Sequence, residues 1–423
     1  MYIKRITLKN IRGFDELDFD LTRGDGGYAG WTVFTGDNGS GKSALLKAIV
    51  VGLLGKEIAR ALQPSFQGWI RDGENEASIK VETIERFEDD AASPLYGSTE
   101  LGKLELKFEN IGRETKLYDQ HESDTFSWSH KGFFYHSFFI CSYGPFRRMS
   151  GPSADAIRGM VAPDTESLVT LFQESATLAE VDQWLIKLHH KSLEKKYPET
   201  HLLGLVLKIL SDDLLPNQIT VDRVDSDGLW LKDRNGVELA WSDMSDGYRS
   251  ALALLSDILR HLMNDEDLGR YSIVENSDGK LVVNRHGVVL IDEIDAHLHP
   301  EWQQKIGFWL KRHFPNIQFL VTTHSPIICQ AADDNGLFVL PGSQDKPKAL
   351  SKEEYNKVIA SRPDTILLTS AFGLQNTRSP RAVEGRAEYA KLKSKRRAGA
   401  QLTQDEEDRM GELEVFGKNE EEL

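Results

Sequence analysis

The fold is decided by the stretch Gly36-Asp37-Asn38-Gly39-Ser40-Gly41-Lys42-Ser43, in a chain of 423 residues. It follows the apolar run 31–34 and precedes a largely apolar, helical run, 44–54. Glycines between a strand and a helix let several main-chain N–H groups point at one anion, and the helix N-terminus adds partial positive charge. In this pattern Lys42 contacts the β- and γ-phosphates of a nucleotide, and the Ser43 hydroxyl binds Mg²⁺. The stretch therefore predicts a phosphate-binding loop rather than an ordinary glycine-rich turn.

Two further strands are predicted to end in polar side chains. The apolar run 287–291 is followed by Asp292 and Glu293, and the run 317–323 is followed by His324. The carboxyl ends of buried parallel strands face the ligand crevice of an α/β sheet. Asp292 suits Mg²⁺, and Glu293 can orient or deprotonate a water in line with the γ-phosphate. An isolated His would be interpreted as structural, but three converging strand ends favour His324 as a γ-phosphate contact.

A fourth motif, Met244-Ser245-Asp246-Gly247, opens a helix. Ser245 is a good N-cap, and apolar residues from Ala251 to Leu262 recur on one face. The start of this helix, with Ser245 and Gly247, is a second candidate anion site. Considered alone, the motif indicates only a capped helix.

Composition narrows the classes of function. The chain has 51 Lys and Arg against 66 Asp and Glu, a formal net charge of −15, so any DNA contact needs a local patch or a partner. Cys141 and Cys329 are the two cysteines, and their spacing does not suit a metal. The sequence has no apolar run of 18 residues and no hydrophobic signal region at its start. We expect reduced thiols, a cytoplasmic location and no membrane contact.

The order of patterns predicts an α/β fold in four segments. Residues 1–150 are the N-terminal half of a nucleotide-binding head with an antiparallel β subdomain, and 151–216 are an inserted helical segment. Residues 217–345 are the C-terminal half, and 346–423 are a helical tail for partner or oligomer contact.

Three local features are expected. The helix after the phosphate loop ends at Gly55. Arg147 and Arg148 follow a buried strand, 132–141, on a loop that is either a ligand contact or a solvated turn. A basic helix, 383–399, is either a partner or nucleic-acid contact or a solvated face.

These motifs, in this order and spacing, resemble the ABC-type ATPase heads of SMC, RecF and related DNA-repair proteins. The resemblance covers roughly residues 1–345, and it includes the opening 6–14 with Arg12 after the first strand. The short middle segment and the run 292–300 look most like compact ATPases of bacterial anti-phage systems, such as Septu, retron-associated and overcoming-lysogenization-defect ATPases. The resemblance implies an ABC/SMC-like P-loop NTPase head with a mixed central sheet.

The resemblance also implies a role for each matching residue. ATP phosphates would lie on the phosphate loop, at Gly36, Asn38, Gly39, Ser40, Gly41, Lys42 and Ser43, with Arg12 approaching the nucleotide. Ser43 and Asp292 would hold Mg²⁺, while Glu293 and His324 would serve the attacking water and the γ-phosphate. Ser245 and Gly247 would cap the nucleotide of an opposite protomer, and Asp295 would contact that protomer. ATP would then join two heads into a homodimer or a higher homo-oligomer.

Two residues depart from the family pattern. Met244 replaces a leucine, and the strand ending near Cys141 is followed by Ser142, Tyr143 and Gly144 where a glutamine is expected. The second departure predicts slow hydrolysis. We therefore expect an ATP-binding and hydrolysing protein that regulates a separate effector, such as a nuclease, in anti-phage defence or DNA maintenance. DNA or a phage component is a further candidate partner. A transporter-type cassette and an ATP-stabilised scaffold with little turnover are the alternatives.

Overall fold

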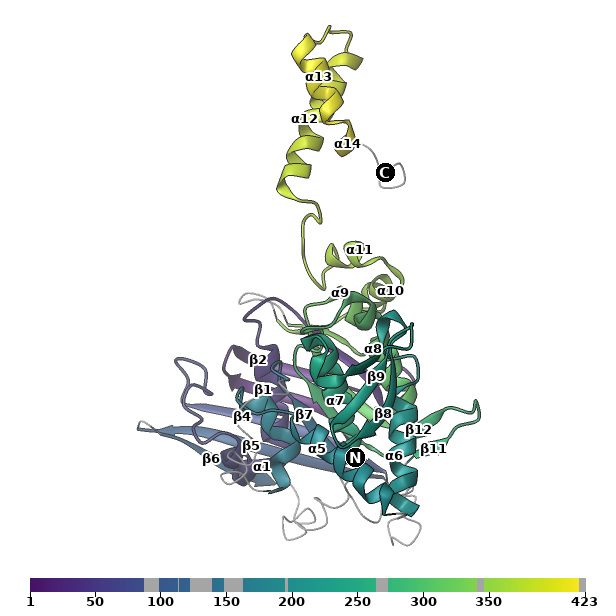
Figure 1. Ribbon diagram of the computed structural model, residues 1–423. Helices are drawn as coiled ribbons and strands as arrows, with labels where there is room; N and C mark the ends of the chain where they lie inside the picture. The colour runs from purple at the N-terminus through teal and green to yellow at the C-terminus, as the bar shows by residue number, and fades with distance from the viewer. Residues whose placement is uncertain are drawn as a thin grey trace. The chain divides into compact units, whose positions relative to one another are not determined.

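The computed structural model describes residues 1–86, 99–112, 114–121, 139–147, 163–194, 197–263, 273–340 and 346–417. The chain forms two compact units, Met1–Ile366 and Leu367–Leu423 (Figure 1). Residues 346–366, which sequence patterns placed in the tail, therefore belong to the first unit. Part of the predicted strand (132–138), Arg148 and the segment 151–162 lie outside the described residues.

A six-stranded central sheet forms the core of the first unit, in the order β16-β15-β3-β14-β13-β7. Neighbouring strands from β15 to β7 are parallel, and only β16 is antiparallel to its neighbour, so the predicted mixed sheet is confirmed. All seven residues of β14 are buried, as expected for a strand covered on both faces. The strands are β3 Gly30–Thr35, β7 Phe139–Tyr143, β13 Gly287–Ile291, β14 Ile317–Thr323, β15 Leu337–Val339 and β16 Lys348–Ala349.

The predicted antiparallel β subdomain is a second sheet of five strands, in the order β2-β1-β4-β5-β6. Alternate residues of its strands face inward and are buried, which is the pattern of a sheet with one solvated face. The two sheets are joined where the Gln318 side chain on β14 exchanges two 2.8 Å hydrogen bonds with the main chain of Ile3 on β1. The strands are β1 Tyr2–Ile11, β2 Phe14–Asp20, β4 Glu76–Arg86, β5 Thr99–Ile111 and β6 Glu114–His121.

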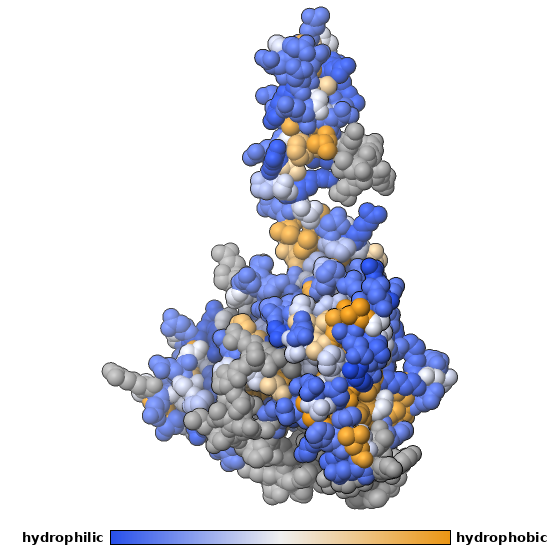
Figure 2. Space-filling view, viewed as in Figure 1, coloured by the Kyte–Doolittle hydropathy of each residue, from blue (hydrophilic) through white to orange (hydrophobic). Residues whose placement is uncertain are grey.

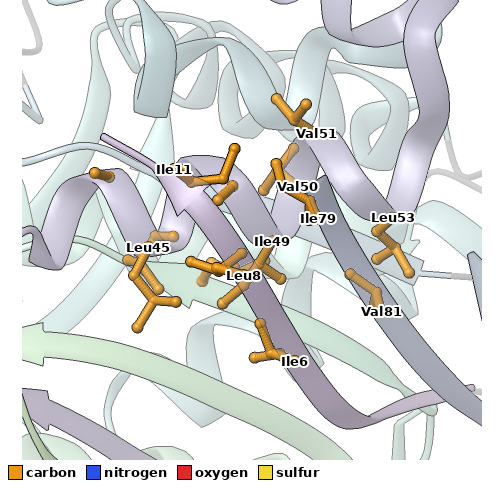
Figure 3. Packing of buried hydrophobic residues seen from close by; sticks show 14 of the residues in the cluster. Ile6, Leu8, Ile11, Leu45, Ile49, Val50, Val51, Leu53, Ile79 and Val81 are labelled. Atoms are coloured by element: carbon orange, nitrogen blue, oxygen red, sulfur yellow. The ribbon is translucent and has the colours of Figure 1, made fainter. Parts of the chain in front are cut away.

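Helix α1 (Lys42–Leu62) contacts strands of both sheets and is buried along most of its length. Figure 3 shows Ile49 and Val50 of α1 among Leu8 of β1 and Ile79 of β4. The helix does not end at Gly55, as the sequence predicted. Gly55 adopts φ 77° and ψ 178°, which makes a kink, and helix resumes to Leu62. A residue without Cβ tolerates this conformation, so glycine produces a bend here rather than a C-cap.

Helices and a small β meander make up the rest of the first unit. The predicted helical segment is confirmed over its described residues, and α5, α6 and α7 contact one another. The helical elements are η2 Pro163–Leu168, α4 Val169–Phe172, α5 Glu180–Leu193, α6 Tyr197–Leu210, η3 Pro216–Gln218, η4 Trp241–Asp243, α7 Asp246–Met263, α8 Pro300–His313, α9 Pro326–Cys329, α10 Lys352–Ala360 and α11 Pro363–Leu367. The remaining strands are β8 Thr220–Asp225, β9 Gly228–Lys232, β10 Glu238–Ala240, β11 Ile273–Glu275 and β12 Leu281–Val283.

A buried polar network links β7 to α7. The Tyr143 hydroxyl donates to Asp257 at 3.0 Å, and Arg260 donates to the same carboxylate at 2.8 Å and to Glu166 at 2.6 Å. Burial opposes ionisation of Asp257, but the charges and hydrogen bonds of His261 and Arg260 outweigh it and hold the Asp257 pKa below its usual range. The network therefore fixes β7, the edge strand of the central sheet, against α7.

The second unit contains the basic helix predicted from sequence, α12 (Pro380–Arg397), with α13 (Gln404–Glu412) and α14 (Glu414–Gly417). A capping box at Thr403 opens α13. Lys395 forms an ion pair with Glu406 at 2.7 Å, and Arg409 forms one with Glu388 at 3.0 Å. Figure 2 shows a mostly hydrophilic surface over α12 and α13. In the described part of the chain, no helix has both the length and the hydropathy needed to cross a bilayer.

Candidate functional site

The carboxyl ends of the central strands lie level with one another. Thr323 of β14 pairs with Thr35 of β3, while Ile291 of β13 pairs with Val321 on one side and with Tyr143 of β7 on the other. The residues that follow these strands therefore emerge along one edge of the sheet. They are the residues of the phosphate loop, the two acids that follow Ile291, and His324. The sequence predicted that these residues converge at one edge of the sheet.

The phosphate loop depends on glycines at two close contacts. Gly36 has φ 150°, and a Cβ there would lie 2.0 Å from the Leu340 carbonyl oxygen. Gly41, the N-cap of α1, has φ 94°, and its Cβ would lie 2.7 Å from the Phe14 ring. A side chain at either position would displace the loop from the sheet and from α1. Asn38 and Gly39 are exposed at its tip, while Ser40 is buried.

Lys42 lies under the loop and is 5% exposed. Its Nζ donates to the carbonyl oxygens of Gly36 and Asp37, both at 2.9 Å. Burial lowers the pKa of Lys42, and the charges of Glu293, Asp292 and Asp295 act in the opposite direction. The lysine thus shares one electrostatic environment with the three acids. Ser43 follows it, half-buried, in the first turn of α1.

Thr322 holds both acids that follow β13. Its hydroxyl donates to Asp292 Oδ1 and accepts from the Glu293 N–H at 2.7 Å. Asp292 is 2% exposed, and its own N–H donates to Tyr143 O at 2.8 Å. Glu293 has φ 45°, a left-handed conformation that is uncommon outside glycine and often found at functional sites. Thr322 was not predicted as a site residue, because a hydroxyl on a buried strand resembles any β-forming residue.

Asp295 and His324 lie next to this pair. Thr323 donates its hydroxyl hydrogen to Asp295 Oδ1 and accepts from the Ser325 N–H at 2.9 Å. Ser325 in turn donates to Gln303 Oε1 at 2.6 Å. His324 stands between these two anchored residues and is half-buried, and its ring takes part in no hydrogen bond or ion pair with a described residue. Its ring is thus held at the strand ends with its nitrogens available to a ligand.

Arg147 is the second site residue that sequence reasoning did not assign. It was expected on a loop with a solvated turn as one alternative, yet it is 3% exposed. Its guanidinium donates to Asp292 O at 3.0 Å and to Glu293 O at 3.1 Å. The solvated-turn alternative is therefore wrong for Arg147.

Arg12 lies beside the first turns of α1. Its guanidinium carbon is 4.8 Å from the centre of the Trp69 ring, and the main-chain N–H of Arg12 donates to Trp69 O at 2.8 Å. Burial lowers the pKa of Arg12. Burial also lowers the pKa of Lys47 on α1, and the positive charge of Arg12 lowers it further. Arg12 is thus close to Lys47, on the α1 side of the site.

Ser245 and Gly247 are placed differently. Ser245 is exposed just before α7, and its carbonyl accepts from Arg249 N–H at 3.1 Å. Gly247 packs against the His297 carbonyl, which would lie 2.5 Å from a Cβ. Among the described residues, no hydrogen bond joins either residue to the phosphate loop.

Both halves of this head match known family models. A model described as "AAA domain" matches residues 5–143, and one described as "AAA domain, putative AbiEii toxin, Type IV TA system" matches residues 178–330. The first contains the phosphate loop, and the second contains Asp292, Glu293 and His324. Both halves of the head are therefore similar to P-loop ATPases.

Similar proteins include a retron ATPase and a Septu protein. This chain is 28% identical over 406 residues to the retron Ec83 probable ATPase of Escherichia coli, covering 80% of this chain and 71% of that protein. It is 26% identical over 380 residues to the Septu protein PtuA of Bacillus mycoides (strain KBAB4). That match covers 89% of this chain but 45% of the relative, so this chain spans less than half of the relative's length. The predicted resemblance to Septu and retron-associated ATPases is confirmed.

The solved structures that are similar to this chain include the SMC head domain from Thermotoga maritima. That structure aligns with 83% of this chain and 100% of its own chain, at 15% identity and a TM-score of 0.44. The strands and helices of this chain form the predicted α/β head. It has the mixed sheet, the antiparallel subdomain, the inserted helices and the helical tail.

Proposed function

We propose that this protein hydrolyses ATP with Mg²⁺ at the carboxyl edge of its central sheet, and that ATP joins two heads which regulate a separate effector. One observation carries the proposal. Lys42, Asp292 and Glu293 come from two distant parts of the chain, and they share one strand-end environment in which Thr322 holds both acids.

The residues present fit a nucleotide and a magnesium ion. Gly36 and Gly41 bring the main chain closer to its neighbours than any Cβ would allow, which leaves N–H groups of the loop free of side-chain cover. Lys42 can exchange its two carbonyl acceptors for phosphate oxygens. The Asp292 carboxylate and the Ser43 hydroxyl are oxygen ligands of the kind that Mg²⁺ prefers. A bound Mg²⁺ would neutralise phosphate charge during transfer.

Glu293 is the proposed general base, because its main-chain N–H is held by Thr322 and its charge acts on Lys42. His324, anchored between Thr323 and Ser325, is the proposed γ-phosphate contact. Arg12 is proposed to approach the nucleotide from the α1 side. Ser43 and Asp292 are the proposed metal ligands.

The two-head arrangement is supported by the positions of three residues. Ser245 is exposed at the start of α7, where the helix N-terminus favours an anion. Gly247 and Asp295 adjoin the same turn, since Gly247 packs against His297 O and the Asp295 carbonyl oxygen accepts from the Leu298 N–H. We propose that Ser245 and Gly247 cap the ATP of a second copy and that Asp295 contacts that copy.

The effector is proposed from the relatives and the second unit. Two relatives are named as a retron ATPase and a Septu protein, which favours a role in anti-phage defence with a nuclease as the separate effector. DNA maintenance is the broader form of this proposal, with DNA or a phage component as a further partner. On α12, Lys391, Lys393, Arg396 and Arg397 are exposed cations that offer a contact surface.

The test is the solution mass of wild type and Glu293→Gln with and without Mg·ATP, together with steady-state phosphate release. We expect ATP to raise the mass, Glu293→Gln to remain assembled, and phosphate release to vanish in that variant. If the solution mass is the same with and without ATP and wild type releases no phosphate, the result would instead support an ATP-stabilised scaffold. Co-purification with a membrane protein would support the transporter-type alternative.

A further inference from the structure

Arg147 donates hydrogen bonds to the main chain of the turn that follows β13 and to its own loop. The guanidinium lies on the loop after β7 and is almost completely buried. Each of its acceptors is a main-chain carbonyl oxygen. They are Asp292 at 3.0 Å, Glu293 at 3.1 Å, Ala296 at 3.3 Å, Ile294 at 3.5 Å and, on its own loop, Gly144 at 3.3 Å.

The chemistry of this contact is specific to arginine. A guanidinium has five N–H donors in a rigid planar fork, so it can hold several carbonyls at fixed relative positions, which a lysine ammonium cannot do. Burial lowers the pKa of Arg147 to about 10, and the charges of Asp295, Asp292 and Glu293 act in the opposite direction. The group remains a cation at neutral pH. Its hydrogen bonds are therefore charge-assisted and stronger than neutral ones.

The turn that Arg147 holds is the one that needs a restraint. Glu293 has φ 45°, which an L-residue keeps only when the surroundings fix it. Thr322 and Thr323 of β14 hold the acids of this turn through their hydroxyls. Arg147 holds the carbonyls of the same turn from the β7 loop. The turn is thus clamped from the two strands that flank β13.

We propose that Arg147 is a positioning residue, which fixes the Asp292–Ala296 turn so that the Glu293 carboxylate faces the water and the Asp295 carboxylate faces the second copy. The inference rests on the proposed role of Glu293. Because Arg147 belongs to the β7 loop, a change in that loop moves the base without moving the phosphate loop. ATP binding and ATP hydrolysis are therefore separable at Arg147.

The experiment compares Arg147→Ala and Arg147→Lys with Arg23→Ala as a matched control. Arg23 is 6% exposed and also donates to a main-chain carbonyl, Trp31 O at 3.2 Å, but it precedes β3 at the opposite edge of the sheet. For each folded variant we would measure kcat, KM and the Kd of a fluorescent ATP analogue, and repeat the assays with millimolar guanidinium. Arg147→Ala is expected to lose about 100-fold in kcat, the usual consequence of misplacing a catalytic group by about 1 Å. Its Kd is expected to change less than threefold.

Guanidinium is expected to restore part of the kcat of Arg147→Ala and to leave that of Arg23→Ala unchanged, which a purely structural role would not produce. Arg147→Lys is expected to fall between wild type and Arg147→Ala. A folded Arg147→Ala with a kcat within threefold of wild type would overturn the inference. So would an equal loss in kcat and in ATP affinity.

Two controls keep the outcomes distinct. If Glu293→Gln is inactive and Arg147→Ala is fully active, the inference fails and the proposed function stands; if Glu293→Gln turns over like wild type, both fail. If neither Arg147 variant folds, hydrogen exchange on wild type decides. A clamped turn predicts slow exchange at Ala296 and Leu298, whose N–H groups donate to Glu293 O and Asp295 O. Complete exchange at both within seconds would overturn the inference.

Discussion

Replacing Thr322 by valine removes a single hydroxyl while keeping the shape of the side chain. The hydroxyl accepts from the Glu293 N–H at 2.7 Å and donates to the Asp292 carboxylate, and Thr322 is fully buried. A buried N–H left unpaired costs about 1–3 kcal/mol, and a hydrogen bond to a charged group contributes about 1.5–3 kcal/mol. We therefore expect the free energy of unfolding to fall by about 3–5 kcal/mol. Phosphate release by the folded fraction should fall about 100-fold, because Glu293 is no longer fixed.

The assay is urea unfolding followed by steady-state phosphate release from folded protein. Thr32→Val is the matched control. Thr32 lies on β3 of the same sheet, is fully buried, and its hydroxyl has no hydrogen-bond partner within the described residues. Loss of the Thr32 hydroxyl should therefore change the free energy of unfolding little. Thr322→Ser, which keeps a hydroxyl, should recover most of the stability and turnover that Thr322→Val loses. Equal stability and turnover in Thr322→Val and Thr32→Val would refute the role assigned to the Thr322 hydroxyl.

Three further predictions concern other parts of the chain. Gly36→Ala should abolish binding of a fluorescent ATP analogue in an otherwise folded protein, because its Cβ would meet the Leu340 carbonyl oxygen; binding close to wild type would contradict this. Asp257→Asn should lower the free energy of unfolding by about 3–5 kcal/mol at pH 7, the cost of breaking a buried pair. Since the pKa of Asp257 is held below its ordinary 3.8, the ionised carboxylate contributes its full stabilisation above pH 3.8. The difference in urea midpoint between wild type and Asp257→Asn should shrink as the pH falls below that value. Reversing the charges of Arg396 and Arg397, while leaving the paired Lys395, should weaken capture of a partner or of DNA without changing ATP affinity; unchanged pull-down and DNA retention would count against this surface.

Local patterns predicted the parts of the head that short segments determine. The phosphate loop, the strands before Asp292 and His324, and the helix after Ser245 all form where the sequence placed them. Each depends on residues that are neighbours in the chain, such as glycines at a loop or apolar runs in a buried strand. The convergence at one sheet edge followed from the rule for parallel strands, and it was correct for the same reason.

The parts that sequence reasoning missed depend on distant contacts. Arg147 finds its carbonyl acceptor on Asp292, 145 residues further along, so a loop with two arginines looked compatible with a solvated turn. Thr322 and Thr323 act through their positions opposite the turn after β13, which nothing in their own segment reveals. At Gly55 the C-cap signal was outweighed by burial of Ala59 and Leu62 beyond the kink, which keeps the chain helical.

The hydrogen bonds between Ile3 and Gln318 join residues 315 positions apart, and β3 lies between two strands from the last third of the head. At roughly 5–20 residues per second on the ribosome, β3 waits roughly 15–60 s for β14 and β15 to be made, and Ile3 waits about as long for Gln318. Contacts this distant in sequence also slow folding once the chain is complete. During that interval β3 has neither of its neighbours in the central sheet. We expect the nascent chain to depend on chaperones, and truncated forms that end before β14 to aggregate rather than bind nucleotide.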